Sequence, residues 1–211
     1  MVQYKKDEIK KRIDEAALHI FSERGYEDSS ISDIAKMANV SVGNIYRYYK
    51  GKDEVFYSVV SPDFIEEFKS TLLNKISSGT LSSNSDTFFL ANEEYIEFMA
   101  SNRERMLVIF SGASGTRYQS IKDEIIDYLI KTVRDSYSEK DNGEYNDVIN
   151  DNNFEFVVRS IYARLIELVS DILMRFNNLY EIRKSLEIID SYHLFGVLEL
   201  WEKRMSKQNY K

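Results

Sequence analysis

Apolar residues recur every three to four positions along most of the chain, which is the spacing of an amphipathic helix. In residues 5–24, for example, Ile13 and Ile20 share one helical face. Gly25 follows as a stop signal. Alternation of apolar and polar residues, the mark of a strand, persists nowhere, so the pattern predicts an all-α fold. The predicted helices are 5–24, 31–38, 42–49, one from 52, one from 62, 88–99, 103–110, 118–137, 154–176 and 180–205, with polar loops at 77–87 and 138–153.

Residues 29–54 hold two short helical segments separated by a tight turn. Ser30 is placed to cap the first segment, with Asp33 three residues later for a return contact. Asn39 suits the turn, and Ser41 is placed to cap the second segment. Two short capped helices at this spacing are typical of a helix-turn-helix.

The second segment, 42–49, has two distinct faces. Ile45 and Tyr49 are four residues apart and point inward together. The opposite face mixes small, amide, phenol and guanidinium groups, a set suited to contacts with DNA. It consists of Val42, Gly43, Asn44, Tyr46 and Arg47.

The charge distribution changes how the net charge of −7 is interpreted. Residues 1–52 carry ten Lys and Arg against eight Asp and Glu, whereas the rest carries eighteen against twenty-seven. The acidic surplus therefore lies outside the segment with the helix-turn-helix, and DNA binding is not excluded. Charged residues interrupt the first helix, and no apolar run is long enough to cross a bilayer. With no Cys in the chain, we expect a cytoplasmic protein without a signal peptide.

The N-terminal motif resembles the signature of the tetracycline-repressor (TetR) family of transcriptional regulators. The matching residues are Gly25-Tyr26, Ser30-Ile31, Asp33-Ile34-Ala35, Ala38, Val40-Ser41, Gly43, Ile45-Tyr46, Tyr48-Tyr49 and Lys52-Asp53. The resemblance covers the first quarter of the chain. It implies a three-helix DNA-binding domain over 1–52, with the motif at about 31–50, and a larger helical ligand-binding and dimerisation domain over 53–211.

The same resemblance implies roles for individual side chains. Gly43 lets the backbone approach a phosphate closely, and Asn44 is suited to adenine, because a carboxamide can bridge its N6 and N7. For Arg47 two contacts remain open, one with guanine and one with the DNA backbone. The predicted DNA contacts are Ser29, Ser30, Ser41, Val42, Gly43, Asn44, Tyr46, Arg47, Tyr48 and Lys52.

Two residues depart from the family pattern. Val42 stands where Lys is frequent and offers an apolar group for a thymine methyl. Tyr49 stands where Phe is usual, so its hydroxyl needs a partner or water. The operator sequence is therefore not inherited by analogy.

The last two helices, together 154–205, are richer in large apolar residues than one neighbour can cover. A purely intramolecular core is one interpretation. The resemblance implies the other, a four-helix bundle between two copies and hence a homodimer on a palindromic operator. The predicted interface residues are Ile161, Leu165, Leu168, Ile172, Ile189, Phe195, Gly196 and Trp201.

Aromatic and Met residues are frequent between these two regions. Most of them are expected in the core, and the functional interpretation is an apolar cavity for a small-molecule effector, as is common in the family. The predicted lining is Phe64, Phe68, Phe89, Tyr95, Phe98, Met99, Met106, Phe110 and Tyr128.

Enzymatic function finds little support in the chain. Its histidines are His19 and His193, so the paired Glu-x-x-His motifs of a di-iron bundle are missing. The sequence Gly112-Ala113-Ser114-Gly115 lacks the spacing of a nucleophile elbow. We therefore expect no catalysis, no metal and no cofactor.

The sequence as a whole predicts a homodimeric regulator that binds double-stranded DNA and is no membrane protein. A repressor released by a small apolar or amphipathic effector is the main hypothesis. Two alternatives remain: a DNA-binding regulator controlled by a protein partner, and a helical scaffold that uses its N-terminal unit on proteins.

Overall fold

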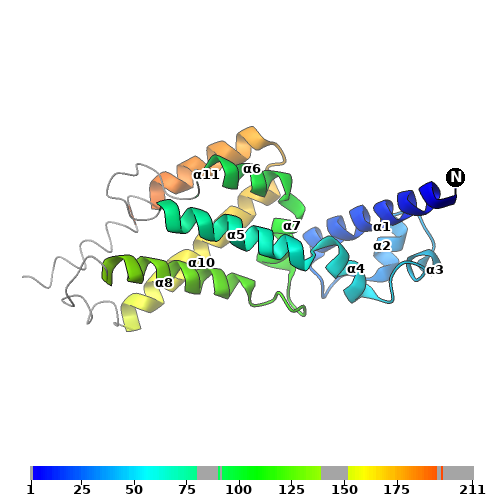
Figure 1. The fold of residues 1–211 in the computed structure, drawn as a ribbon, viewed down its shortest axis with the longest axis horizontal. Helices are drawn as coiled ribbons and strands as arrows, with labels where there is room; N and C mark the ends of the chain where they lie inside the picture. The colour runs from blue at the N-terminus through cyan, green and yellow to red at the C-terminus, as the bar shows by residue number, and fades with distance from the viewer. Residues whose placement is uncertain (1, 80–89, 91, 139–151, 194–195, 197–211) are drawn as a thin grey trace, which may run out of the picture. The chain divides into compact units, whose positions relative to one another are not determined.

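The computed structural model describes residues 2–79, 90, 92–138, 152–193 and 196 (Figure 1). Within these residues the chain is helical and has no strand, which confirms the all-α class. None of these helices has the length and hydropathy needed to cross a membrane. They are α1 (Val2–Arg24), α2 (Ile31–Met37), α3 (Val42–Ile45), α4 (Lys52–Val59), α5 (Pro62–Gly79), α6 (Glu93–Ser101), α7 (Arg103–Leu107), the π-helix η2 (Val108–Gly112), α8 (Ile121–Ser138), α10 (Asn152–Arg175) and α11 (Leu179–His193).

The chain divides into two compact units. Unit 1 comprises Met1–Lys69 and Asn102–Ile121, and unit 2 comprises Ser70–Ser101 and Lys122–Lys211. This division by packing differs from the domain boundary predicted at residue 52, because α4, α7 and η2 all pack on α1. Most of the two predicted polar loops, and the last predicted helix beyond 196, lie outside the described residues.

Helix α1 forms the centre of unit 1. Its inward residues Ile13, Ala17 and Phe21 are completely buried. The Phe21 ring meets the Phe56 ring of α4 edge to face, with centroids 5.2 Å apart. Apolar packing on α1 therefore positions the helices that follow it.

The predicted caps and turn of the helix-turn-helix are confirmed. The Ser30 hydroxyl accepts a hydrogen bond from Asp33 N at 3.1 Å, and the Ser41 hydroxyl accepts one from Asn44 N at 3.2 Å. Asn39 has a φ of 52°, the left-handed conformation that asparagine tolerates. Arg12 of α1 donates to the carbonyls of Ala38 and Asn39, and so satisfies groups that the end of α2 leaves free.

The second helix of the motif is shorter than predicted. The α-helical part of α3 ends at Ile45, and the chain continues in turns instead of reaching Tyr49 as a helix. Arg47 N bonds to Asn44 O and Tyr48 N to Ile45 O, which are the tighter three-residue steps of a helix end. Tyr49 nevertheless lies on the inward side with Ile45, because its N–H bonds back to Ile45 O at 3.0 Å.

Two glycines bring the end of α1 against η2. Gly25 has a φ of 77°, which a residue without Cβ adopts freely, and it ends α1 as predicted. Tyr26 N donates to Gly112 O at 2.8 Å. A Cβ on Gly112 would lie 2.9 Å from Phe21 O, closer than real Cβ contacts come. The single helix predicted over 103–110 is in fact α7 followed by η2, which carries the chain to this contact.

Unit 2 is a helical assembly in which α11 packs against α6 and α10. Tyr162 of α10 and Leu186 of α11 are among its fully or almost fully buried side chains. Arg134 of α8 and Glu155 of α10 form an ion pair at 2.7 Å. This bond holds the pKa of Glu155 below its usual value.

Candidate nucleic-acid interface

The outer face of α3 is exposed as predicted. Val42 is 39 % exposed and Tyr46 57 %, and Gly43 and Arg47 are exposed as well. Asn44 is half-buried. A Cβ added to Gly43 would meet only the Ser41 hydroxyl, at 3.9 Å, so packing within the chain does not require glycine there.

The three predicted serines already have roles within unit 1. Ser30 caps α2, and its hydroxyl donates to Asp33 at 2.6 Å. That bond lowers the pKa of Asp33, with Arg24 3.7 Å away as a further charge. Ser29 is buried and its hydroxyl donates to Gly25 O, so it serves the turn after α1 instead of the surface. Ser41 caps α3 and stays exposed.

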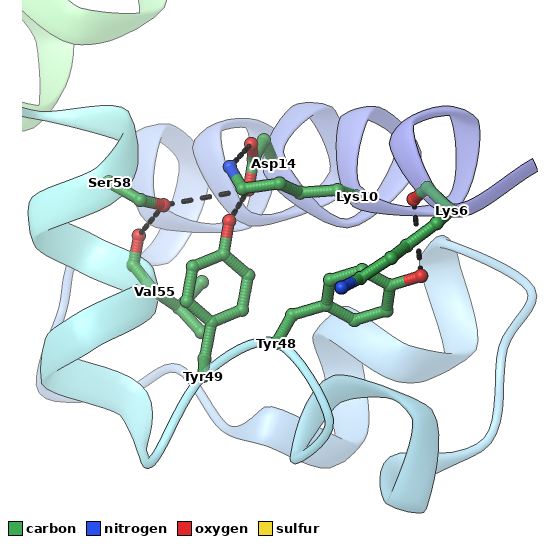
Figure 2. A network of polar contacts seen from close by, with 7 residues as sticks. All are labelled: Lys6, Lys10, Asp14, Tyr48, Tyr49, Val55 and Ser58. Atoms are coloured by element: carbon green, nitrogen blue, oxygen red, sulfur yellow. Dashed lines mark hydrogen bonds and ion pairs between the residues drawn. The ribbon is translucent and has the colours of Figure 1, made fainter. Parts of the chain in front are cut away.

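The tyrosines around the end of α3 point in different directions. Tyr46 is exposed, whereas the Tyr48 hydroxyl donates to Lys6 O of α1 at 3.1 Å (Figure 2). Tyr49 is 4 % exposed, and its hydroxyl donates to Asp14 of α1. The hydroxyl that sets Tyr49 apart from the family pattern therefore has a protein partner.

Lys52 forms a clamp at the start of α4. Its ammonium donates to the carbonyls of Tyr26 at 2.8 Å, Ser29 at 3.0 Å and Glu27 at 3.3 Å. It also lies 4.2 Å from the centroid of the Tyr26 ring. An ammonium has three hydrogens, so all its donors are engaged inside unit 1. The geometry is that of a residue holding the loop between α1 and α2, and the predicted DNA contact of Lys52 competes with this clamp.

Other cations are exposed near the motif. The side chains of Lys6, Lys36, Arg47 and Lys50 form no hydrogen bond or ion pair within the described part of unit 1. Lys6, Lys36 and Lys50 were not among the predicted contacts. For Lys36 the sequence held a signal that could have predicted its exposure, since helical periodicity places it on the outer side of α2. The link between Lys6 and Tyr48 spans 42 residues and has no counterpart in local sequence.

A second candidate surface lies on α10 and α11 in unit 2. It is a half-open apolar groove of about 390 Å³, with Phe156 and Tyr192 71 % and 76 % exposed. Four predicted interface residues line it: Ile161, Leu165, Leu168 and Ile189. Ile172 is buried, Gly196 is exposed, and Phe195 and Trp201 lie outside the described residues.

The predicted effector residues divide between the two units. Phe64, Phe68, Met106 and Phe110 are buried in unit 1, where the Phe68 and Phe110 rings are 5.9 Å apart. In unit 2, Tyr95 and Met99 are buried and Phe98 and Tyr128 half-buried, while Phe89 lies outside the described residues. Within each unit these side chains belong to the packing.

No group of His, Asp and Glu in the described part of the chain is arranged to hold a metal ion. The His19 ring instead links helices, with Nδ1 2.9 Å from Glu104 of α7 and Nε2 3.5 Å from Glu23.

Comparisons with known proteins agree with this geometry. Residues 13–59 match the family model described as "Bacterial regulatory proteins, tetR family". An HTH-type transcriptional regulator of Staphylococcus aureus (strain USA300) is 30 % identical over 139 residues, which are 62 % of this chain and 72 % of that protein. Another HTH-type transcriptional regulator, from S. aureus (strain MRSA252), is 38 % identical over 65 residues, which are 29 % of this chain and 35 % of that protein.

Among solved structures, a TetR-like transcriptional regulator from Rhodococcus sp. RHA1 has the same fold, with a TM-score of 0.54. Its sequence is 21 % identical, and the match covers 89 % of this chain and 96 % of that one. Fold, motif and relatives together define a helix-turn-helix DNA-binding regulator of transcription. The chain belongs to the TetR family.

Proposed function

We propose that this regulator is a cytoplasmic, homodimeric repressor that binds a palindromic operator through α3 and is released by a small apolar or amphipathic effector. The exposure of the outer face of α3 is the observation that supports the proposed DNA contact. Gly43, Tyr46 and Arg47 are exposed there, and the packing of unit 1 makes no use of their side chains or of the missing Cβ.

The chemistry of this face suits both kinds of DNA contact. Asn44 is the side chain that we assign to an adenine edge, and Val42 to a thymine methyl. The Tyr46 hydroxyl and the ammonium of Lys50 are suited to phosphates, which position a protein without reading sequence. Arg47 is suited to either a guanine or a phosphate, and the two roles differ in a measurable way.

A second copy of the chain is the proposed occupant of the groove on α10 and α11. The exposed side chains include Phe156, Leu168 and Tyr192, which give unit 2 an apolar face. Exposure of such a face to water is unfavourable in free energy. Burial between two copies removes that cost and pairs two copies of α3, which a palindromic operator matches.

The proposed effector would bind among aromatic and Met side chains of unit 2. Aromatic and sulfur side chains concentrate in α6, where Tyr95 and Met99 are buried and Phe98 is half-buried. An apolar molecule that enters among them would be expected to alter the packing on which DNA binding depends. Native mass spectrometry of the purified protein, followed by DNA binding with the extracted molecule added back, tests this step.

Selection of genomic fragments by the purified protein, followed by footprinting, tests the DNA assignment. We expect a protected inverted repeat. The double variant Tyr46→Ala/Arg47→Ala should abolish this protection while leaving the helical circular dichroism unchanged. The matched control, Tyr180→Ala/Arg175→Ala, removes the same side-chain types from exposed positions in unit 2 and should leave protection intact.

Salt dependence then distinguishes the roles of Arg47. Loss of a phosphate contact lowers the slope of log K against log salt by about one, whereas loss of a base contact relaxes sequence preference at one position. Uniform binding to all fragments, or protection that survives the double variant, would contradict the proposed interface.

A further inference from the structure

In unit 1 a junction joins Asp14 of α1 to Tyr49, the residue that follows the turns after α3 (Figure 2). The Tyr49 hydroxyl donates to one carboxylate oxygen of Asp14. Lys10 donates to the other oxygen at 2.8 Å and lies 5.3 Å from the centroid of the Tyr49 ring. The carboxylate and the ammonium thus both lie beside the phenol group.

The hydroxyl is not needed to pack the ring. The ring of Tyr49 and the side chain of Ile45 are both buried, and a phenylalanine ring would bury the same apolar surface. A buried hydroxyl without a partner is costly, so Asp14 first of all satisfies it. Burial, and next the hydrogen bond to Asp14, raises the pKa of Tyr49, which keeps the phenol in its donating form.

Ser58 of α4 contributes little to the junction. Its hydroxyl donates to Val55 O at 2.7 Å, whereas its distance to Asp14 is 3.5 Å, at the limit of a hydrogen bond. The junction is therefore a link between α1 and the end of the α3 segment.

This link, together with the hydrogen bond from Tyr48 to Lys6 O, supplies a direction that apolar packing does not. Helix α3 has a single turn, and apolar contacts are non-directional, so burial of Ile45 alone leaves rotation about the helix axis weakly defined. A charge-assisted hydrogen bond has a preferred direction and joins α3's end to a helix 35 residues earlier. Asn44 precedes Tyr49 by five residues. The direction in which its side chain points therefore depends on the rotation of α3.

We propose that Tyr49 and Asp14 are positioning residues that fix the orientation of α3 and thereby set the sequence specificity of DNA binding. The inference rests on the proposed function of α3. Phosphate contacts tolerate small rotations, whereas hydrogen bonds to base edges do not. Loss of the junction should therefore weaken operator binding much more than non-specific binding.

The test measures two dissociation constants, one for the selected operator and one for a scrambled duplex of the same length. The specificity ratio is the constant for the scrambled duplex divided by the constant for the operator. Destabilisation lowers the folded fraction and affects both constants equally, so it cancels in the ratio. We expect Tyr49→Phe and Asp14→Ala each to lower the ratio about tenfold (about 1.4 kcal/mol). The double variant should lower it no further, because the two side chains act as one contact.

Tyr57→Phe is the matched control. It also removes a tyrosine hydroxyl with a hydrogen-bond partner in unit 1, but that partner, Arg117 N at 3.1 Å, belongs to neither α1 nor the α3 segment. Its ratio should equal that of the wild type. A ratio unchanged in Tyr49→Phe, or additive losses in the double variant, would overturn the inference. If the wild-type protein binds all DNA fragments with equal affinity, the proposed function is wrong, and the positioning role of Tyr49 and Asp14 is wrong as well.

Discussion

The clamp formed by Lys52 makes a quantitative prediction that separates it from a phosphate contact. Lys52→Met keeps most of the aliphatic stem and removes the ammonium, and with it three hydrogen bonds of 2.8–3.3 Å and the contact with the Tyr26 ring. Bonds from a charged donor contribute 1.5–3 kcal/mol each when buried, but these carbonyls lie near the surface and are rehydrated, so we expect a total loss of about 2–3 kcal/mol. For a chain of 211 residues this lowers the melting temperature by about 5–10 °C.

The assays are thermal unfolding without DNA and operator binding over a range of salt concentrations. Because all three hydrogens of the ammonium are engaged in unit 1, Lys52→Met should leave the salt slope unchanged once unfolding is corrected for. The control Lys50→Met should do the opposite, leaving stability unchanged and reducing the slope by about one. An unchanged melting temperature together with a lower slope for Lys52→Met would refute the clamp.

Three further predictions concern other parts of the chain. Gly112→Ala should cost about 1–3 kcal/mol of unfolding free energy in a denaturant titration, because its Cβ meets a carbonyl of α1 at 2.9 Å, whereas Gly51→Ala, with nothing within 4 Å, should not destabilise by packing. Leu168→Glu should convert the proposed dimer to monomer in sedimentation velocity, and an unchanged mass would exclude the groove as the interface. The lowered pKa of Glu155 means that its stabilising pair with Arg134 is present above pH 4.5 and is lost as pH falls through that lowered value. Glu155→Gln should accordingly melt below the wild type at about pH 7, and the difference between them should shrink as the pH falls below 4.5.

Local signals in the sequence were sufficient for most of the motif. Ser30 and Ser41 cap their helices because a cap needs a partner only three residues away. Gly25 adopts a positive φ because it has no Cβ, and Asn39 because its short polar side chain tolerates that conformation. The exposed face of α3 followed from helical periodicity in the same way.

Long-range partners were not predictable in this manner. Lys52 is basic and near the motif, and only the fold shows that its ammonium turns toward carbonyls 23 to 26 residues earlier. The early end of α3 likewise depends on tertiary contacts, since Tyr46 to Tyr49 have no residue that breaks a helix. In unit 2 the apolar residues of the groove could be identified in the sequence. The groove itself could not be predicted, because its shape depends on how α10 and α11 lie together.

The composition of unit 1 from two separate stretches of chain limits how the protein can be made and recombined. Residues 102–121 complete the packing on α1, although residues 70–101 belong to the other unit. During synthesis, the DNA-binding part is therefore incomplete until residue 121 has left the ribosome, after more than half of the 211 residues. A chimera that exchanges this part with a relative has to carry both stretches, because a cut at residue 52 would leave the glycine contact and the buried face of α1 with foreign neighbours.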